Sequence, residues 1–283
     1  MGTGGAVKRF CVIGDPVAHS RSPELFAHFA RHLSLPLTYE RLRVEPPHLK
    51  EFLASGEARQ FRGINVTIPH KEQVLNLVTE LSPAAREIGA VNCLIPGEEG
   101  WTGDNTDWEG FRRLLRHLPV DVSAWQWVVL GAGGASRAVL YALIRLGVDK
   151  LIVINRSSRR FPRLADRITA WNPKVHVEFR NSWKQVSTRQ AIAWVNTTPL
   201  GMPPWEQESP LPPEAIESHH LLVDTVYIPS QTQFIKQGLA KGARTTNGFL
   251  MFLYQGLLSL ERWLGKEVRN TVDVERIRLS MER

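Results

Sequence analysis

Four short polar clusters stand at the ends of apolar segments in the N-terminal half of the chain: HSRSP, NVTIPHK, AVN and GDNTD. If the apolar segments are strands of a parallel sheet, these ends converge on one edge, which is where α/β proteins bind ligands. The clusters supply hydroxyls, amides, carboxylates and one lysine. Such a set favours a site for a small acid that carries hydroxyl groups.

Ser20 and Ser22 flank the start of a helix that we predict at Pro23. Their two hydroxyls, together with the amides of the helix N-terminus, could hold a carboxylate. A serine before Pro-Glu is also an ordinary N-cap residue. Carboxylate binding and helix capping therefore both stay open for this pair.

Lys71 and Asp107 are the candidates for proton transfer. We expect Lys71 in the first turn of a helix that begins at Pro69, where the helix dipole disfavours a cation. A lysine whose charged form is disfavoured can exchange a proton near neutral pH, as a general acid or base must. If Asp107 faces it across a cleft, the carboxylate would orient the ammonium group and hold a substrate hydroxyl. The competing interpretations are a solvated surface lysine and a carboxylate that only stabilises a helix start.

A glycine-rich turn in the middle of the chain suits a dinucleotide. Gly131, Gly133 and Ser136 follow the pattern G-x-G-x-x-[G/A] except at its last position. The turn follows the strand-like run 127–130, opens a helical segment and precedes another strand-like run, as in one βαβ unit. Backbone without side chains lets a pyrophosphate approach the amides at the helix N-terminus. A simple tight turn between strand and helix is the alternative.

The residues after the next strand favour NADP over NAD. An acid at this place would bind the ribose hydroxyls of NAD, but Asn155 and Arg156 stand there. Arginine makes planar, bidentate contacts with phosphate, so Arg156 and Arg160 suit the additional phosphate of NADP. A solvated basic turn is the alternative interpretation.

Strand-like and helix-like segments alternate along the chain, which is typical of α/β folds. The pattern predicts an N-terminal α/β substrate domain and a Rossmann-type, doubly wound NADP-binding domain, with C-terminal helices that return to the first domain. We expect residues 1–107 and 248–283 in the substrate domain and residues 108–247 in the NADP-binding domain. The expected strands are 9–14, 37–44, 63–68, 90–95, 127–130, 151–155, 191–196 and 221–227, and the expected helices are 24–33, 48–55, 69–78, 107–118, 131–147, 233–242, 249–263 and 272–281.

Composition narrows the class of protein. A chain of 283 residues is long enough for two packed domains, and its formal charge of +7 comes mostly from scattered basic residues. The one dense basic cluster directly follows a strand, which favours a phosphate on a small ligand over nucleic acid. Two cysteines, Cys11 and Cys93, leave almost no material for disulfides or a thiolate metal site. No run is long enough to span a membrane, so we expect a cytoplasmic protein without nucleic-acid, membrane or metal partners.

Nine runs, in order and spread over nearly the whole chain, resemble the shikimate dehydrogenase family. They are IGDPVAHSRSP, GINVTIPHK, GAVN, GDNTD, GAGGASRA, INRSSRR, NTTPLGM, VDTVY and NGFLMFLYQ. The resemblance implies reversible, NADP-dependent reduction of 3-dehydroshikimate to shikimate, a step in the synthesis of aromatic amino acids through chorismate. It implies a small-molecule substrate; a homodimer stays open.

The resemblance also implies roles for individual residues. Lys71 would transfer the proton with Asp107 as its partner. Residues that would bind the substrate are Ser20, Ser22 and Tyr227 at the carboxylate, and Asn65, Thr67, Asn92, Asp107 and Gln255 at the ring hydroxyls. Residues that would bind NADP are Gly131, Ala132, Gly133, Gly134 and Ala135 at the pyrophosphate, Asn155, Arg156, Ser157 and Arg160 at the adenosine end, and Thr225, Gly248 and Met251 on the nicotinamide side.

Some positions depart from the family pattern. Phe26 and Ala27 stand where the family often has His-Asn, and Gln233 stands where it usually has proline. Thr225 stands where a larger apolar residue is common in the family. Two alternatives remain: a relative of broader specificity that also oxidises quinate, and a regulatory homologue that binds the same ligands without catalysis.

Overall fold

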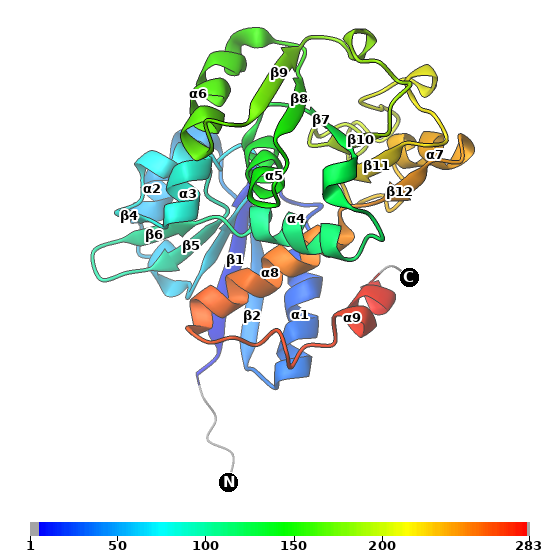
Figure 1. The fold of residues 1–283 in the computed structure, drawn as a ribbon. Helices are drawn as coiled ribbons and strands as arrows, with labels where there is room; N and C mark the ends of the chain where they lie inside the picture. Colours follow the sequence, from blue (N-terminus) through cyan, green and yellow to red (C-terminus); the bar gives the residue numbers. More distant parts are fainter. Residues whose placement is uncertain (1–5, 282–283) are drawn as a thin grey trace. The chain divides into compact units, whose positions relative to one another are not determined.

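The computed structural model describes residues 6–281 and divides into two compact units (Figure 1). The first unit combines the chain up to Thr106 with the chain from Leu253 onward, and the second unit is Asp107–Phe252. The domain boundaries predicted from the sequence were at residues 107/108 and 247/248. Which unit binds substrate and which binds NADP stays a prediction at this point.

The first unit is built on a mixed sheet of six strands in the order β2-β1-β3-β5-β6-β4. The strands β1, β2 and β3 run parallel, whereas β5 pairs antiparallel with both β3 and β6. The expectation of a parallel edge was therefore only partly right. The strands are β1 (Lys8–Gly14), β2 (Leu37–Arg43), β3 (Ile64–Val66), β4 (Glu80–Leu81), β5 (Cys93–Pro96) and β6 (Trp101–Asp104).

The reversed direction of β5 is what brings the polar clusters together. Because β5 runs antiparallel to β3, its beginning lies at the edge where β3 ends, and Asn65 stands opposite Cys93 in the register. Asn92, directly before β5, consequently lies beside Asn65. The helices of this unit are α1 (Ser22–Leu33), α2 (Leu49–Ala54), α3 (Pro83–Ile88), the later part of α8 (Phe249–Leu264) and α9 (Val274–Met281).

The α-helix predicted from Pro69 is wrong. The chain makes turns there, followed only by a 3₁₀ helix, Gln73–Asn76. The carbonyl of Lys71 accepts a hydrogen bond from the amide of Val91 at 2.8 Å, so a contact distant in sequence takes the place of an α-helical bond. The argument that a helix dipole acts on Lys71 falls with the helix. The short elements β4, α3 and β6 were not predicted.

The second unit contains a six-stranded sheet that is parallel throughout, in the order β12-β11-β10-β7-β8-β9. This order confirms the doubly wound fold. In folds of this type ligands bind where the connections leave two neighbouring strands in opposite directions, and those strands are β7 and β10 here. The strands are β7 (Gln126–Leu130), β8 (Lys150–Ile154), β9 (His176–Arg180), β10 (Ile192–Asn196), β11 (Leu221–Asp224) and β12 (Arg244–Thr246), and the helices are α4 (Asp107–Arg116), α5 (Gly134–Arg145), α6 (Phe161–Trp171) and α7 (Gln233–Ala240).

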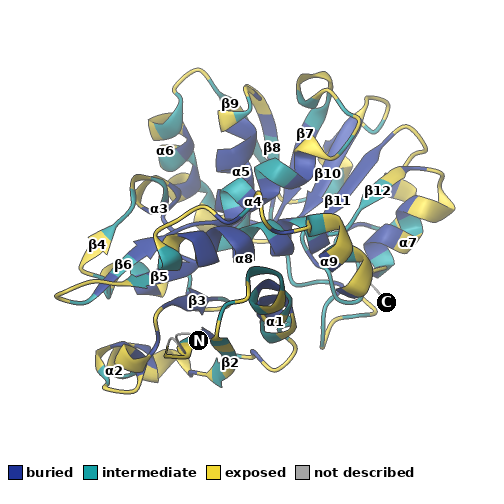
Figure 2. Cartoon of the chain, turned by 90° about the horizontal axis from the view of Figure 1, so that it is seen from below, coloured by how far each residue is buried: buried dark blue, intermediate teal, exposed yellow. Residues whose placement is uncertain are grey.

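The helix α5 is the central element of the second unit. Its residues from Ser136 to Ile144 are all buried, because α4, α6 and β7 pack against it. The strands of the sheet are mostly buried as well, whereas the outward faces of helices such as α7 are exposed (Figure 2). Among residues 6–281 there is no helix with the length and apolar character needed to cross a bilayer.

Gly63 offers a test of core packing in the first unit. A Cβ atom at this position would overlap the ring of Trp263, which is held by stacking on Phe10 and by a hydrogen bond from its Nε1 to the carbonyl of Leu94. We expect Gly63→Ala to lower the free energy of unfolding by about 1–3 kcal/mol through overpacking. Urea denaturation measures the effect. The control Gly56→Ala adds a methyl group into open space, and an equal loss in both variants would contradict the explanation.

Candidate functional site

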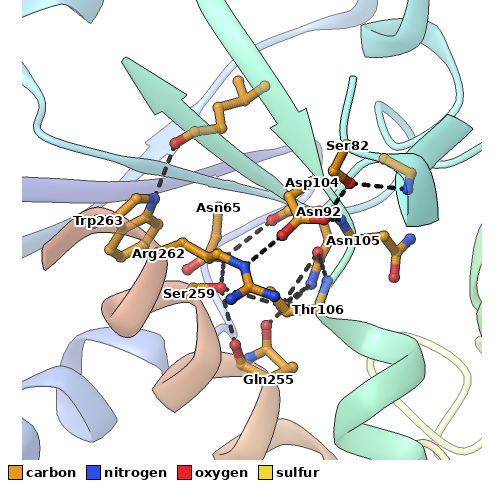
Figure 3. Close-up of polar contacts among 12 residues, drawn as sticks. Asn65, Ser82, Asn92, Asp104, Asn105, Thr106, Gln255, Ser259, Arg262 and Trp263 are labelled. Carbon is orange, nitrogen blue, oxygen red and sulfur yellow. Dashed lines mark hydrogen bonds and ion pairs between the residues drawn. The ribbon is translucent and has the colours of Figure 1, made fainter. Parts of the chain in front are cut away.

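A cluster of amides and hydroxyls, all but one of them buried, lies at the edge of the first sheet (Figure 3). We call it the amide cluster; its members are Asn65, Asn92, Thr106, Gln255 and Ser259. Asn65 Nδ2 donates to the Asn92 carbonyl at 3.0 Å and to Ser259 Oγ at 2.9 Å. Asn92 Nδ2 donates to Thr106 Oγ1 at 2.9 Å and to Gln255 Oε1 at 3.3 Å. The structure thus brings together three residues assigned to substrate hydroxyls by resemblance, and adds two that the sequence analysis missed.

The amide cluster also fixes the backbone just before Asp107. The amide of Thr106 donates to Asn92 Oδ1 at 2.7 Å, and Asn105 Nδ2 donates to the carbonyl of Ala90 at 2.9 Å. Asp107 follows directly as the first residue of α4 and is buried. The polar contacts thus hold the GDNTD segment in one conformation up to Thr106.

Asp104 ties three elements of the first unit to each other. Its carboxylate accepts hydrogen bonds from the hydroxyl of Ser82, from the amide of Asn105 and from Nε of Arg262 (Figure 3). Ser82 is also the N-cap residue of α3 and accepts from the amide of Ala85. Sequence analysis missed these partners. The sequence of α8 did contain a signal. Gln255, Ser259 and Arg262 are polar and are spaced by four and three residues, which places them on one face of the helix.

Ser20 and Ser22 lie together, as the carboxylate-binding interpretation needs. Ser20 Oγ lies 3.1 Å from Ser22 Oγ and 3.3 Å from the amide of Ser22. The helix α1 begins at Ser22, and its N-cap position is Arg21, without a side-chain cap. The alternative in which Ser22 is the N-cap residue is therefore wrong, because its hydroxyl pairs with Ser20 Oγ and not with a backbone amide of α1.

Lys71 lies in the turn after β3 and is partly buried. His70 anchors this turn, because its buried ring nitrogen Nε2 lies 2.7 Å from the carbonyl of Val44. Thr67 enters the same turn and donates its amide to the carbonyl of Ile13 at 2.9 Å. Lys71 belongs to the first unit and Asp107 to the second, and their pairing stays a prediction.

The glycine-rich turn after β7, where the sequence predicts a pyrophosphate site, depends on the absence of side chains. Gly131 adopts φ 114°, which L side chains rarely adopt, and a Cβ there would lie 2.6 Å from Thr197 Oγ1. A Cβ at Gly133 would make only an ordinary contact, 3.7 Å from Arg160 Nη1, and α5 begins at Gly134 with bare backbone. A dinucleotide phosphate fits this helix N-terminus.

The serine at the last position of the glycine pattern is explained by one hydrogen bond. Ser136 is fully buried, and its hydroxyl donates to the carbonyl of Gly131 at 2.8 Å. The side chain folds back on the turn and satisfies its own polar group.

Basic side chains follow β8, as the preference for NADP requires. Arg156 and Arg160 are exposed, and Arg160 Nη1 reaches the carbonyl of Ala132 in the glycine-rich turn at 3.4 Å. Asn155 Nδ2 donates to the carbonyl of Ser157 at 2.7 Å, which shapes the loop. The structure places these residues and Gly133 around one end of the sheet, in keeping with a phosphate-bearing ligand.

The residues assigned to the nicotinamide side lie in the second unit, in or near the loop that follows β11. Gly248 lies against the carbonyl of Thr225, where a Cβ would overlap the backbone, and its amide donates to the carbonyl of Val226 at 3.0 Å. Met251 is buried in the core of the same unit. Tyr227, assigned to the substrate carboxylate, stacks on Phe252 with ring centroids 4.2 Å apart.

Asp224, the last residue of β11, holds the loop that follows this strand. The sequence analysis did not predict this role. Its carboxylate accepts from Asn196 Nδ2 at 2.9 Å, from the amide of Val226 at 2.9 Å and from Thr232 Oγ1 at 2.6 Å. It is fully buried, and burial raises its pKa to about 6 although these donors favour the charged form. No cluster of three or more potential metal ligands occurs within residues 6–281.

A doubly wound sheet whose first strand leads through a bare turn into a buried helix is the architecture of dinucleotide-dependent dehydrogenases, in which a second domain supplies the ligands of the substrate. Residues 12–94 match the family described as the shikimate dehydrogenase substrate binding domain. The NADP-dependent shikimate dehydrogenase of Carboxydothermus hydrogenoformans is 37% identical, over 94% of this chain and 94% of the relative. The chain belongs to the shikimate dehydrogenase family.

Two solved structures have the same fold. The shikimate 5-dehydrogenase of Thermus thermophilus, in complex with NADP(H) and shikimate, is 34% identical with a TM-score of 0.82, and the match covers 96% of this chain and 99% of that one. The quinate dehydrogenase of Corynebacterium glutamicum, in complex with NAD, is 29% identical with a TM-score of 0.83, covering 97% and 98%. The likeness extends through both units.

The raised pKa of Asp224 predicts a pH-dependent stability. The folded chain binds this proton more tightly than the unfolded chain, so the contribution to stability is complete below the ordinary pKa and is lost as the pH rises through about 6. The free energy of unfolding of the natural chain, minus that of Asp224→Asn, should fall by about 2 kcal/mol between about pH 4 and pH 7. Urea denaturation of both proteins across this range measures it. A difference that does not change with pH would contradict the assignment.

Proposed function

We propose that this protein catalyses the reversible, NADP-dependent reduction of 3-dehydroshikimate to shikimate in the pathway to chorismate and the aromatic amino acids. The observation that carries the proposal is the amide cluster, where residues assigned to the ring hydroxyls by resemblance share one set of hydrogen bonds. The solved structure of the Thermus thermophilus relative is a complex with NADP(H) and shikimate. We assign substrate binding to the first unit and NADP binding to the second.

The proposed mechanism places the substrate by its polar groups. The hydroxyls of Ser20 and Ser22, with Tyr227, bind the carboxylate, while Thr67 and the three carboxamides of the amide cluster, Asn65, Asn92 and Gln255, bind the ring hydroxyls. The bare turn from Gly131 to Ala135 receives the pyrophosphate, and Asn155, Arg156, Ser157 and Arg160 receive the adenosine end. Thr225, Gly248 and Met251 border the nicotinamide, which supplies the hydride when bound.

Proton transfer falls to Lys71 in this proposal. In the direction of reduction, its ammonium group gives a proton to the oxygen that was the carbonyl oxygen of the substrate; in the direction of oxidation, it takes the proton of that hydroxyl. The carboxylate of Asp107 orients the ammonium group and accepts a hydrogen bond from a neighbouring hydroxyl. Both residues being present favours catalysis over a purely regulatory role.

Activity on quinate is the second candidate, favoured by the likeness to the Corynebacterium glutamicum enzyme. The arginines after β8 support NADP as the cofactor. A cytoplasmic location fits the two buried free thiols, Cys11 and Cys93. Assembly as a homodimer stays a prediction.

The first experiment compares cofactors in a spectrophotometric assay of nicotinamide reduction with shikimate. We expect turnover with NADP, and a KM for NADP that rises about ten-fold or more in Arg156→Gln, with little change in the KM for NAD, because a charged contact to the additional phosphate is lost. Arg163→Gln, an exposed arginine in α6, is the matched control. Absence of turnover with shikimate and NADP, alongside turnover of quinate, would replace the first proposal by the second.

Lys71→Ala tests the proton-transfer role. We expect kcat to fall by about 10²–10⁴-fold, while the dissociation constant for shikimate, measured by titration calorimetry, stays within a few-fold. Lys50→Ala removes an exposed lysine of the same unit and serves as the control. An unchanged kcat in the Lys71 variant would exclude this residue from proton transfer.

A further inference from the structure

The carboxamide of Asn65 has its donors fully used inside the protein. The side chain is 6% exposed, and its two N–H groups go to the carbonyl of Asn92 and to the hydroxyl of Ser259. On the other side, the amide oxygen accepts a hydrogen bond from Tyr39 Oη at 2.7 Å. One lone pair of that oxygen remains for a further hydrogen bond.

The orientation of this amide follows from the chemistry of its partners. The carbonyl of Asn92 can only accept, so a flipped amide would place two oxygens 3.0 Å apart. Ser259 has one proton, which it donates to the carbonyl of Gln255 at 2.9 Å, so toward Asn65 it also acts as an acceptor. Both contacts require the nitrogen of Asn65 on this side.

Tyr39 completes the arrangement from the opposite side. Its ring stacks on Phe26 with centroids 4.1 Å apart, which holds the hydroxyl in place against the amide oxygen. Because the nitrogen of Asn65 is fixed on the side of Asn92 and Ser259, the amide oxygen faces Tyr39, whose hydroxyl donates to it. The two hydroxyls, one on β2 and one on α8, therefore support the same orientation of Asn65.

We propose that Tyr39 and Ser259 are positioning residues, which hold the Asn65 carboxamide so that it can bind a ligand only as a hydrogen-bond acceptor. This inference rests on the proposed function, in which Asn65 binds a ring hydroxyl. Asn65 then selects a group that carries a proton, a hydroxyl, and disfavours a keto or ether oxygen at the same place. Discrimination of this kind is strong, because a buried acceptor opposite another acceptor is left unpaired.

The experiment uses Tyr39→Phe and Ser259→Ala, each made in the natural chain and in Asn65→Ala. Tyr39→Phe keeps the ring that stacks on Phe26 and removes only the hydroxyl. In the natural chain, each change should raise the KM for shikimate about three- to ten-fold and leave the KM for NADP within about two-fold. In the Asn65→Ala background neither change should raise the KM for shikimate further, because both act through Asn65.

Thr79→Val is the matched control, since it removes a hydroxyl that donates to the carbonyl of Trp101 in the same unit and does not contact Asn65. Equal increases with and without Asn65, or no increase in the natural chain, would overturn the inference. If the natural chain did not turn over shikimate, the proposed function would fail on its own. The orientation is then decided by NMR: slow solvent exchange of the Asn65 side-chain amide protons, accelerated in Ser259→Ala, supports it, and rapid exchange in the natural chain overturns it.

Discussion

The hydrogen bond between Asn65 and the carbonyl of Asn92 depends on one strand that runs against its neighbour. Had β5 paired parallel with β3, Asn92 would have stood at the opposite end of the sheet from Asn65. The antiparallel pairing puts both amides at one edge, and the buried position of each requires that all its donors be paired. Thr106, Gln255 and Ser259 meet this requirement, so the site and the packing of α8 share one set of contacts.

The second unit also has to pair its buried polar groups, but it does so with other side chains. The ends of its strands carry glycines and short polar side chains. Its buried carboxylate, Asp224, is surrounded by donors from three separate segments. A carboxylate left unpaired at this depth would be costly, so Asn196, Val226 and Thr232 must stay in place for the loop after β11 to keep its shape. Thr225 and Tyr227, which the proposed mechanism uses, lie in that loop.

Local sequence patterns predicted most of the fold. Apolar runs such as 151–155 and 191–196, and the glycine-rich turn at residue 131, predicted the doubly wound unit because its strands are continuous and buried on both faces. The helix expected at Pro69 failed for a non-local reason: the amide of Val91 takes the carbonyl of Lys71, and no pattern within ten residues reveals it. Two-residue β4 and six-residue α3 are too short for periodicity to detect.

The candidate site likewise has residues that the sequence predicted and residues that depend on contacts distant in sequence. Asn65 and Asn92 stand within family-like runs, were predicted as site residues and lie together in the structure. Tyr39, Ser259 and Arg262 were not predicted, because each looks like an ordinary member of a strand or helix until its neighbour in space is known. Helical spacing from Gln255 pointed to Ser259 only in retrospect.

Ser136 has a consequence for how dinucleotide sites are recognised. A pattern that demands glycine or alanine at the end of the motif would pass over this chain. A serine whose hydroxyl is returned to the carbonyl five residues earlier occupies little more room than a methyl group and leaves no polar atom exposed to the neighbouring backbone. The position is better defined by compactness and internal pairing than by residue type.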